Sequence, residues 1–426
     1  MQMKLPKTAV LMLRGVEGCG VSTYARHFKA FFDDSQATCD IFALNLNIGR
    51  PDTSTDINLT LFDFSEAAEL VNTINANYDL VLVFSVPAKN APSSVVENYV
   101  EFIIEPISVP KWMINHDHHF LSIGRNADYT RAIEACDGLL CHSLTETRSG
   151  FVSWLKKRNI SKVVKKMDVF FHVPFVEHLI DLDRGEKRRK RLINAARAVA
   201  WKRGSIILNL HDALADRGFV TEMIGFERSI AGYSQLRNYE GKIKWFTDRG
   251  FYKPVKGPSA FSSARINNEL FDYLDEVGQN PDFMYVIGSY DYKRGLRRIS
   301  ESAFATHPRS FEHNNLDYGN NFEYQGLEAA LLAVPIFHRH FLDTVVLPDG
   351  SGTLAQTGTF LSIDDDNRHL SKGGPQVLDA GQLAERLDEI WNDSSEYRRM
   401  RTNSVDLIRS HYSSEVVVPR LLDALS

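Results

Sequence analysis

The sequence predicts an α/β protein made of two doubly wound, Rossmann-like domains. The chain has 426 residues, a length that fits two domains of about 200 residues better than one. Short apolar runs alternate with amphipathic stretches along both halves, which is typical of βαβ units around a parallel sheet. A polar stretch over residues 181–191 interrupts this alternation and predicts a linker. We therefore expect domains over residues 1–183 and 184–408, and a C-terminal helix over 409–426 that packs back on the first domain.

The elements of the first domain are assigned from the length, periodicity and β-branched or aromatic content of each run. Strands are expected at residues 9–13, 41–44, 59–62, 80–84, 112–114, 138–141 and 169–171. Helices are expected at residues 22–32, 67–74 and 95–104.

The same pattern resumes in the second domain. Strands are expected at residues 193–199, 220–224, 243–246, 284–287, 304–306 and 335–337. Helices are expected at residues 206–214, 327–332, 380–391, 395–410 and 416–425. Open α/β sheets bind ligands outside the carboxyl ends of their strands, so we expect a ligand cleft between the two domains.

The composition excludes several classes of protein. A net charge of −5 argues against a uniformly basic nucleic-acid-binding protein, so DNA binding would require a local basic surface. The four cysteines are scattered and form no CxxC pair, which favours a reducing cytoplasm over a disulfide framework. No apolar run approaches the roughly 20 residues that cross a bilayer, so we expect no membrane partner.

A glycine-rich segment follows the first expected strand and opens the first helix. Residues 14–21 read R-G-V-E-G-C-G-V, which nearly spells a P-loop, but Val21 stands where a P-loop has its lysine. Without that ammonium group an NTPase or kinase is not favoured. Glycines and a helix N-terminus still suit a binding loop that contains Glu17 and Gly18, with a tight βα turn as the alternative.

A dense polar segment, Asn115-His116-Asp117-His118-His119, follows the strand expected at 112–114. Its place at a strand end favours hydrogen bonding to a substrate. His116 and His118 could also share a metal ion, but no third ligand has convincing spacing. A simple polar loop is the remaining alternative.

Two further segments suit a nucleotide. Arg197 and Lys202 form an R-x4-K pair between a strand and a helix, where two cations can neutralise a diphosphate. Glu323 and Glu328 lie at an expected helix, where a carboxylate can accept hydrogen bonds from the vicinal hydroxyls of a ribose. Surface cations and an ordinary exposed glutamate are the alternatives.

In this order the segments resemble GT-B glycosyltransferases, and most closely the DNA α-glucosyltransferases of T-even bacteriophages. The similarity spans most of the chain and is strongest in the first 150 residues. It is carried by R-G-V-E-G-C-G-V at 14–21, S-V-P-A at 85–88, H-D-H at 116–118, L-S at 121–122, R-N at 125–126, W-K at 201–202, G-F-E-R-S at 225–229, E-Y at 323–324 and L-E at 327–328.

The resemblance implies a GT-B fold and a retaining enzyme that needs no metal or other cofactor. UDP-glucose would be the donor, and 5-hydroxymethylcytosine in double-stranded DNA the acceptor. Arg197 and Lys202 would hold the diphosphate. Glu328 would bind the ribose and Glu323 would help to place the sugar. Asp117, His116 and His118 would face the acceptor, and Glu17 and Gly18 would line the same site.

Two basic runs are candidates for the DNA backbone, with a solvated helix face and a charged linker as alternatives. Their members are Lys156, Lys157, Arg158, Lys165, Lys166, Arg188 and Arg189. We expect a monomer in the cytoplasm of an infected bacterial host.

Other functions stay open at this point. UDP-arabinose could replace UDP-glucose, because one hydroxymethyl group changes binding only modestly. Hydroxymethyluracil or hydroxycytosine could be the acceptor. A non-catalytic DNA-binding or sugar-nucleotide-sensing protein, or a metal-dependent nuclease that uses the histidines, are the alternatives from other classes.

Overall fold

The fold is given by a computed structural model. It describes residues 5–13, 20–45, 59–84, 92–115, 126–142, 153, 155–179, 188–195, 205–224, 241–247, 250–252, 274–276, 278–287, 292–307, 324–338, 347–352, 354–357, 360–362 and 380–425.

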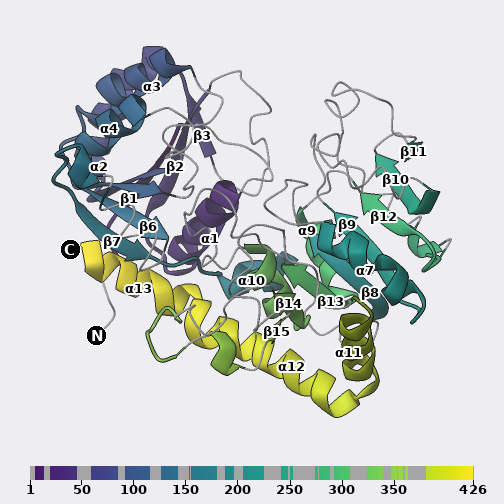
Figure 1. The fold of residues 1–426 in the computed structure, drawn as a ribbon. Helices are drawn as coiled ribbons and strands as arrows, with labels where there is room; N and C mark the ends of the chain where they lie inside the picture. Colours follow the sequence, from purple (N-terminus) through teal and green to yellow (C-terminus); the bar gives the residue numbers. More distant parts are fainter. Residues whose placement is uncertain are drawn as a thin grey trace. The chain divides into compact units, whose positions relative to one another are not determined.

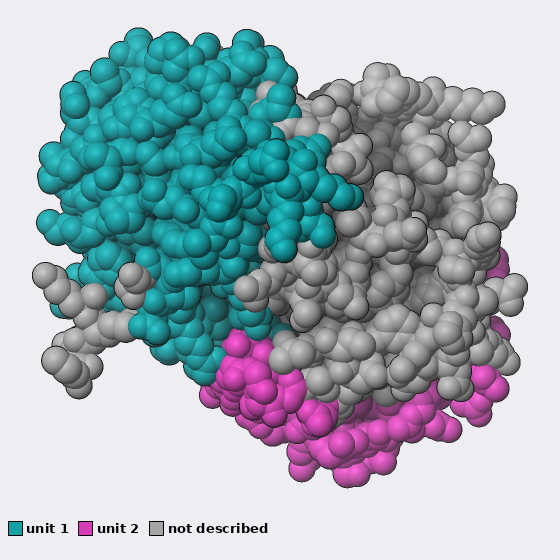
Figure 2. Space-filling model, turned by 60° about the vertical axis from the view of Figure 1, so that its left-hand side comes forward, with its two compact units in different colours: residues 1–175, 412–426 teal, residues 176–411 magenta. Residues whose placement is uncertain are grey.

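The chain divides into two compact units, residues 1–175 with 412–426 and residues 176–411 (Figure 2). These divisions differ from the boundaries expected after 183 and after 408, and local packing explains the difference. Phe175 still packs against His27 of unit 1, with 5.4 Å between ring centroids. At the other division, His411 Nδ1 lies 2.8 Å from Asp349 Oδ2 of unit 2. The next residue, Tyr412, accepts a hydrogen bond from Phe171 N of unit 1.

Unit 1 contains a parallel sheet in the order β3-β2-β1-β4-β5-β6-β7 (Figure 1). Its strands are β1 (Thr8–Met12), β2 (Cys39–Leu44), β3 (Leu59–Phe62), β4 (Leu80–Phe84), β5 (Lys111–Asn115), β6 (Gly138–His142) and β7 (Val163–Met167). Its helices are α1 (Gly20–Asp34), α2 (Ala67–Asn77), α3 (Ser93–Tyr99), α4 (Asn126–Glu134) and α13 (Ser414–Leu425), while α6 (Val173–Leu179) lies across the division.

The two faces of this sheet are covered by different helices. Alternate residues of the central strands, such as Leu11 and Val83, pack in one cluster with apolar residues of α2 and α4 and of the π-helical turn Val100–Ile104. On the opposite face Tyr24 of α1 contacts Phe84, with 5.7 Å between ring centroids. Both faces are therefore apolar, which explains why these strands read as continuous hydrophobic runs.

The C-terminal helix α13 packs on unit 1, as expected. Ser414 N donates to Phe171 O at 2.7 Å, and Lys165 Nζ donates to Ala424 O near the end of the helix. The ring of His172 joins α13 to α1, because its Nδ1 lies 2.7 Å from Ser414 Oγ and its Nε2 lies 2.7 Å from Asp34 Oδ2.

Gly138→Ala is expected to lower the free energy of unfolding by about 1–3 kcal/mol through overpacking. Gly138 of β6 is paired with Trp112 of β5, and a Cβ at position 138 would overlap the Trp112 ring. That ring is 7% exposed and has Lys165 Nζ 4.8 Å from its centroid, so it has little room to move. Gly241→Ala is the control, since no atom of the described residues lies within 4 Å of its Cβ position. Equal urea midpoints for the two variants would contradict this account.

Unit 2 contains a second sheet in the order β11-β10-β12-β9-β8-β13-β14-β15, in which β11 is antiparallel to β10. Its strands are β8 (Arg189–Ala195), β9 (Val220–Ile224), β10 (Ile243–Thr247), β11 (Gly250–Tyr252), β12 (Met284–Ile287), β13 (Ser302–His307), β14 (Ile336–His338) and β15 (Phe360–Ser362). Its helices are α7 (Ser205–Ala215), α9 (Tyr292–Ser300), α10 (Tyr324–Leu331), α11 (Ala380–Asn392) and α12 (Ser394–Leu407).

The core of unit 2 lies between the sheet and the helices α7, α11 and α12, and Leu192 and Phe304 of the sheet are part of it. They share one apolar cluster with Leu214 of α7, Leu387 of α11 and Met400 of α12. The neighbouring residue Arg191 points to the opposite face of the sheet, where it meets Arg298 of α9. Among the described residues, no helix is long and apolar enough to span a bilayer.

Two expectations from the sequence were wrong in detail. Residues 169–171 do not form a sheet strand; the strand is β7, and Phe171 only forms a bridge with Ser413. Residues 189–191 belong to β8 and not to a linker, so the strand expected at 193–199 begins four residues earlier, at Arg189. Both strands carry cations that hide their apolar pattern, Lys165 and Lys166 in β7 and three basic residues in β8.

Candidate functional site

In unit 1, three segments singled out from the sequence start at one edge of the sheet. The strand order reverses between β1 and β4, which is the topological switch point where open α/β sheets bind ligands. The glycine-rich segment 14–21 follows β1, residues 85–88 follow β4, and the H-D-H segment follows β5. Met12 is paired with Phe84, and Phe84 with Ile114, so these strands end side by side.

The predicted side chains on these segments lie outside the described residues. They are Glu17, Gly18, His116, Asp117 and His118. The strands that precede these residues, β1 and β5, end at the same edge of the sheet. The roles of the residues themselves stay predictions.

Unit 2 repeats this arrangement. Its switch point lies between β8 and β13, whose residues Ile193 and Ala305 are paired near the carboxyl ends. Arg197 and Lys202 follow β8, and the helix α10 follows β13. The R-x4-K pair and the helix that carries Glu328 are therefore attached to the two strands that flank the switch point. Arg197, Lys202 and Glu323 themselves lie outside the described residues.

Glu328 is the predicted donor-site residue whose surroundings are described. It lies in α10 with 9% of its surface exposed, and its Oε1 accepts a hydrogen bond from Tyr292 Oη at 2.9 Å. Gln325 Nε2, near the start of α10, donates to Thr306 O of β13 at 2.8 Å. These contacts fix α10 and its carboxylate beside the carboxyl end of β13. Tyr292 was missed from the sequence because nothing in its neighbourhood signals a partner 36 residues away.

The first basic run contains both exposed and engaged side chains. Lys156 and Lys157 are exposed and Arg158 is half-buried. Lys166 Nζ lies 3.2 Å from Asp168 Oδ2, and Lys165 is held by Ala424 O and the Trp112 ring. Lys156 and Lys157 are therefore the members of this run most available to a phosphate backbone.

The second basic run is used inside unit 2. Arg188 Nη1 and Nη2 donate to Ala333 O at 2.6 Å and Leu332 O at 2.8 Å, just beyond the last residue of α10. Burial lowers the pKa of this guanidinium. Arg189 Nη1 lies 2.8 Å from Asp275 Oδ1. These contacts engage both guanidinium groups within unit 2, and a DNA-binding role of Arg188 and Arg189 stays a prediction.

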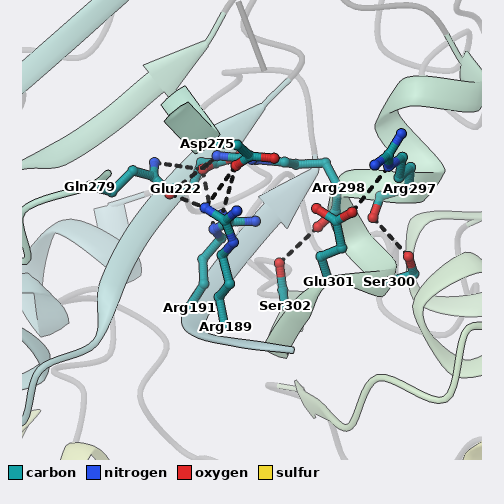
Figure 3. A network of polar contacts seen from close by, with 10 residues as sticks. All are labelled: Arg189, Arg191, Glu222, Asp275, Gln279, Arg297, Arg298, Ser300, Glu301 and Ser302. Atoms are coloured by element: carbon teal, nitrogen blue, oxygen red, sulfur yellow. Dashed lines mark hydrogen bonds and ion pairs between the residues drawn. The ribbon is translucent and has the colours of Figure 1, made fainter. Parts of the chain in front are cut away.

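A buried ionic network lies beside β8 and β9 (Figure 3). Glu222 is fully buried, and both its carboxylate oxygens accept from Arg298, at 2.7 Å from Nε and 2.8 Å from Nη2. Arg191 Nε lies 3.4 Å from Glu222 Oε2 and Arg298 Nη1 lies 2.5 Å from Asp275 Oδ1. The network starts from residues 189–191, at the amino end of β8 and away from its carboxyl end. We assign it to stability.

No metal cluster was found in the part of the chain that is described, where no group of three or more suitable side chains could hold an ion. The histidine segment 116–119 lies outside that part. Cys39, Cys136 and Cys141 are buried in the core of unit 1 and form no disulfide.

The chain has two doubly wound sheets, parallel apart from the edge strand β11, and each has its switch point next to segments predicted to bind the nucleotide or the substrate. This is the arrangement of a GT-B fold. No family model matches the sequence. The sequence is 21% identical to the DNA alpha-glucosyltransferase of Enterobacteria phage T4 over 441 aligned positions, gaps included, which span 99% of this chain and 100% of that protein.

Solved structures extend this similarity to three dimensions. An alpha-glucosyltransferase in complex with UDP and a 13-mer DNA containing an HMU base has a TM-score of 0.78 at 17% identity, over 99% of both chains. An alpha-glucosyltransferase in complex with UDP-glucose and DNA containing an abasic site has a TM-score of 0.77 at 16% identity, again over 99% of both chains. The GT-B fold expected from the sequence is thus confirmed.

Proposed function

We propose that this chain is a DNA glycosyltransferase. It transfers glucose from UDP-glucose to the hydroxymethyl group of 5-hydroxymethylcytosine in double-stranded DNA, with retention of configuration. The observation that carries the proposal is a similarity over 99% of the chain to an enzyme solved with both UDP-glucose and DNA. In this chain, the predicted donor-binding segments follow β8 and β13, the two strands that flank the switch point of unit 2.

The donor is held by unit 2 in this proposal. Arg197 and Lys202 neutralise the diphosphate, first in the bound donor and then in the departing UDP. Glu328 accepts hydrogen bonds from the ribose hydroxyls, and Glu323 helps to place the sugar. Glu17 and Gly18 on the glycine-rich segment line the same site.

The acceptor is a primary alcohol on a pyrimidine that is stacked within the duplex. It reaches an enclosed site only if the nucleotide is extruded, at a cost of a few kcal/mol. Contacts to the DNA backbone offset this cost, and the exposed Lys156 and Lys157 are suited to make them. Asp117, with His116 and His118, orients the alcohol at the reacting sugar carbon.

The reaction exchanges one C1–O bond for another. The bond from the glucose C1 to the β-phosphate oxygen breaks with oxocarbenium character while the alcohol oxygen bonds to C1. The leaving phosphate takes the proton of the alcohol on the same face of the sugar, and UDP departs. A side-chain base is not required, and Asp117 stabilises the positive charge that develops. No metal ion takes part.

The proposed setting is the cytoplasm of an infected bacterial host, where the enzyme acts as a monomer. The similarity to a phage enzyme supports this setting.

Glucose is expected to be added when the purified protein is incubated with DNA that contains 5-hydroxymethylcytosine and a panel of UDP-sugars. UDP-glucose, UDP-arabinose and UDP-galactose are each tested in a separate reaction, because glucose and galactose add the same mass, and nucleoside mass spectrometry reads the mass that is added. Parallel reactions use DNA with hydroxymethyluracil, hydroxycytosine or unmodified cytosine, and a chelator tests for a metal requirement.

Each result has a defined meaning. Addition of a pentose mass would assign UDP-arabinose as the donor, and addition to hydroxymethyluracil would change the acceptor. Bound metal by elemental analysis together with cleaved DNA would favour the nuclease. DNA binding without addition from any donor would reject the enzymatic proposal in favour of a binding protein.

A further inference from the structure

A tyrosine from a separate helix contacts the carboxylate proposed to bind ribose. Tyr292 is the first residue of α9, which follows β12, whereas Glu328 lies in the second turn of α10, which follows β13. Tyr292 Oη donates to Glu328 Oε1 at 2.9 Å, and the contact is partly buried. The hydrogen bond thus joins two helices that start from different strands of the sheet.

The backbone of α10 is held at both ends by other side chains. Gln325 Nε2 donates to Thr306 O at the carboxyl end of β13. Beyond the last turn, the two Nη atoms of Arg188 donate to Leu332 O and Ala333 O. Leu327 and Ala329, on either side of Glu328, are fully buried. The helix is therefore fixed, and the conformation of the Glu328 side chain is what a further hydrogen bond can control.

We propose that Tyr292 is a positioning residue for the nucleotide-sugar donor. Its hydroxyl holds the plane of the Glu328 carboxylate before the donor arrives, so that the ribose diol meets oriented acceptors. An ionised carboxylate offers about four lone-pair sites, so it can accept from a phenol and from ribose hydroxyls at the same time. This inference rests on the proposed function and adds a residue to its donor site.

The energetic reason is preorganisation. A glutamate side chain that becomes ordered only on binding loses rotamer freedom, and this loss weakens donor affinity. A side chain that a hydrogen bond already holds in place avoids this loss. The phenol acts before chemistry and is equally present in the ground and transition states. Its removal should therefore raise KM for the donor and leave kcat unchanged.

Tyr292→Phe is expected to raise KM for UDP-glucose about tenfold, the effect of one lost hydrogen bond to a charged group. We expect kcat and KM for hydroxymethylated DNA to change less than about twofold, since uniform donor binding alone is lost. Isothermal titration with UDP gives a second readout, in which Kd rises by a factor similar to that for KM.

A donor analogue distinguishes positioning from a general structural role. The wild-type enzyme should prefer UDP-glucose over its 2′-deoxyribose analogue, and Tyr292→Phe should reduce that preference. In a Glu328→Ala background the additional effect of Tyr292→Phe should be small, because the acceptor group that Tyr292 orients is already gone.

Tyr78→Phe is the matched control. The Tyr78 hydroxyl is partly buried in unit 1 and donates to Asp40 Oδ2 at 2.7 Å, so the variant also loses a hydrogen bond from a phenol to a carboxylate, but outside unit 2. It should lower the melting temperature without changing KM or the preference for the intact ribose.

The inference is overturned if Tyr292→Phe keeps the wild-type KM and preference, or if its KM changes no more than that of Tyr78→Phe. It is also overturned if the effects of Tyr292→Phe and Glu328→Ala add in full. A wild-type protein that neither binds UDP nor transfers sugar would instead reject the proposed function itself.

Discussion

Replacing Arg197 and Lys202 together with alanine is expected to reduce kcat by about 1,000-fold or more. A single group that stabilises charge in a transition state contributes about 100- to 1,000-fold, and two cations are removed here. UDP departs with negative charge on its β-phosphate, and these side chains are the proposed counter-charge. The pair is removed together because one remaining cation can partly replace the other. The measurement is steady-state transfer from radiolabelled UDP-glucose to hydroxymethylated DNA.

The control for this double variant is Arg398→Ala with Arg399→Ala, which removes two exposed cations from α12. It keeps the net charge of the two proteins equal, so a general effect of charge on DNA binding affects both alike. We expect DNA affinity to be similar in the two variants. Transfer at the wild-type rate by the Arg197 and Lys202 variant would reject the diphosphate assignment and leave the fold untouched.

The sequence predicted much of the fold because many of its strands are apolar on both faces. Leu80–Phe84 is buried throughout, and a short apolar run bounded by polar residues is a strong signal for such a strand. The place of each candidate segment directly after a strand could be predicted for the same reason. In a parallel sheet, segments that follow strands all lie at the carboxyl edge, so their common location could be predicted. The positions of their side chains could not.

Other elements were missed because their charges are satisfied inside the protein. Lys165 of β7 lies over the Trp112 ring and donates to Ala424 O of α13. Arg191 of β8 and Arg298 of α9 form ion pairs with the buried Glu222. A periodicity argument treats each of these side chains as solvent-exposed, since it has no access to a partner far away in the sequence. The same limit applies to Arg188, which the sequence shows only as a member of a basic run, while its side chain donates to carbonyls just beyond α10.

The candidate site shows this contrast at the level of single residues. Glu328 could be proposed from its own segment, because an acidic residue on a helix after a strand has a recognisable context. Tyr292 could not, because its role depends on a contact between α9 and α10. Sequence reasoning therefore found residues that would touch the ligand more readily than a residue that orients them.

Glu222→Gln is expected to destabilise unit 2 by about 3–5 kcal/mol, the usual effect of breaking a buried ion pair by removing one partner. The neutral amide leaves the buried guanidinium groups of Arg191 and Arg298 without their shared carboxylate, and Asp275 cannot neutralise both. A loss of this size should lower the melting temperature of the unit by about 10 °C. Glu389→Gln is the control, since its pair with Arg386 is exposed and should contribute less than about 1 kcal/mol.

A triple variant separates the loss of charge balance from the loss of packing. Arg191→Met, Glu222→Met and Arg298→Met together remove all three charges and keep the space filled with apolar atoms. Buried ion networks can often be replaced in this way at little cost, so we expect the triple variant to be more stable than Glu222→Gln. If the triple variant is the less stable of the two, the ionic contacts stabilise unit 2 more than apolar packing of similar volume does.

The acid dependence of stability gives an independent test of the same network. Burial alone would raise the pKa of Glu222, but the guanidinium groups of Arg298 and Arg191 outweigh burial and hold this pKa at about 2, below its ordinary value of 4.5. Because the folded pKa is the lower one, the stabilisation is complete above about pH 4.5 and is lost as the pH falls towards 2. Glu222→Gln should therefore flatten the decrease in unfolding free energy across this window, whereas Glu389→Gln should keep the wild-type slope. Parallel curves for wild type and Glu222→Gln would mean that other carboxylates govern acid unfolding.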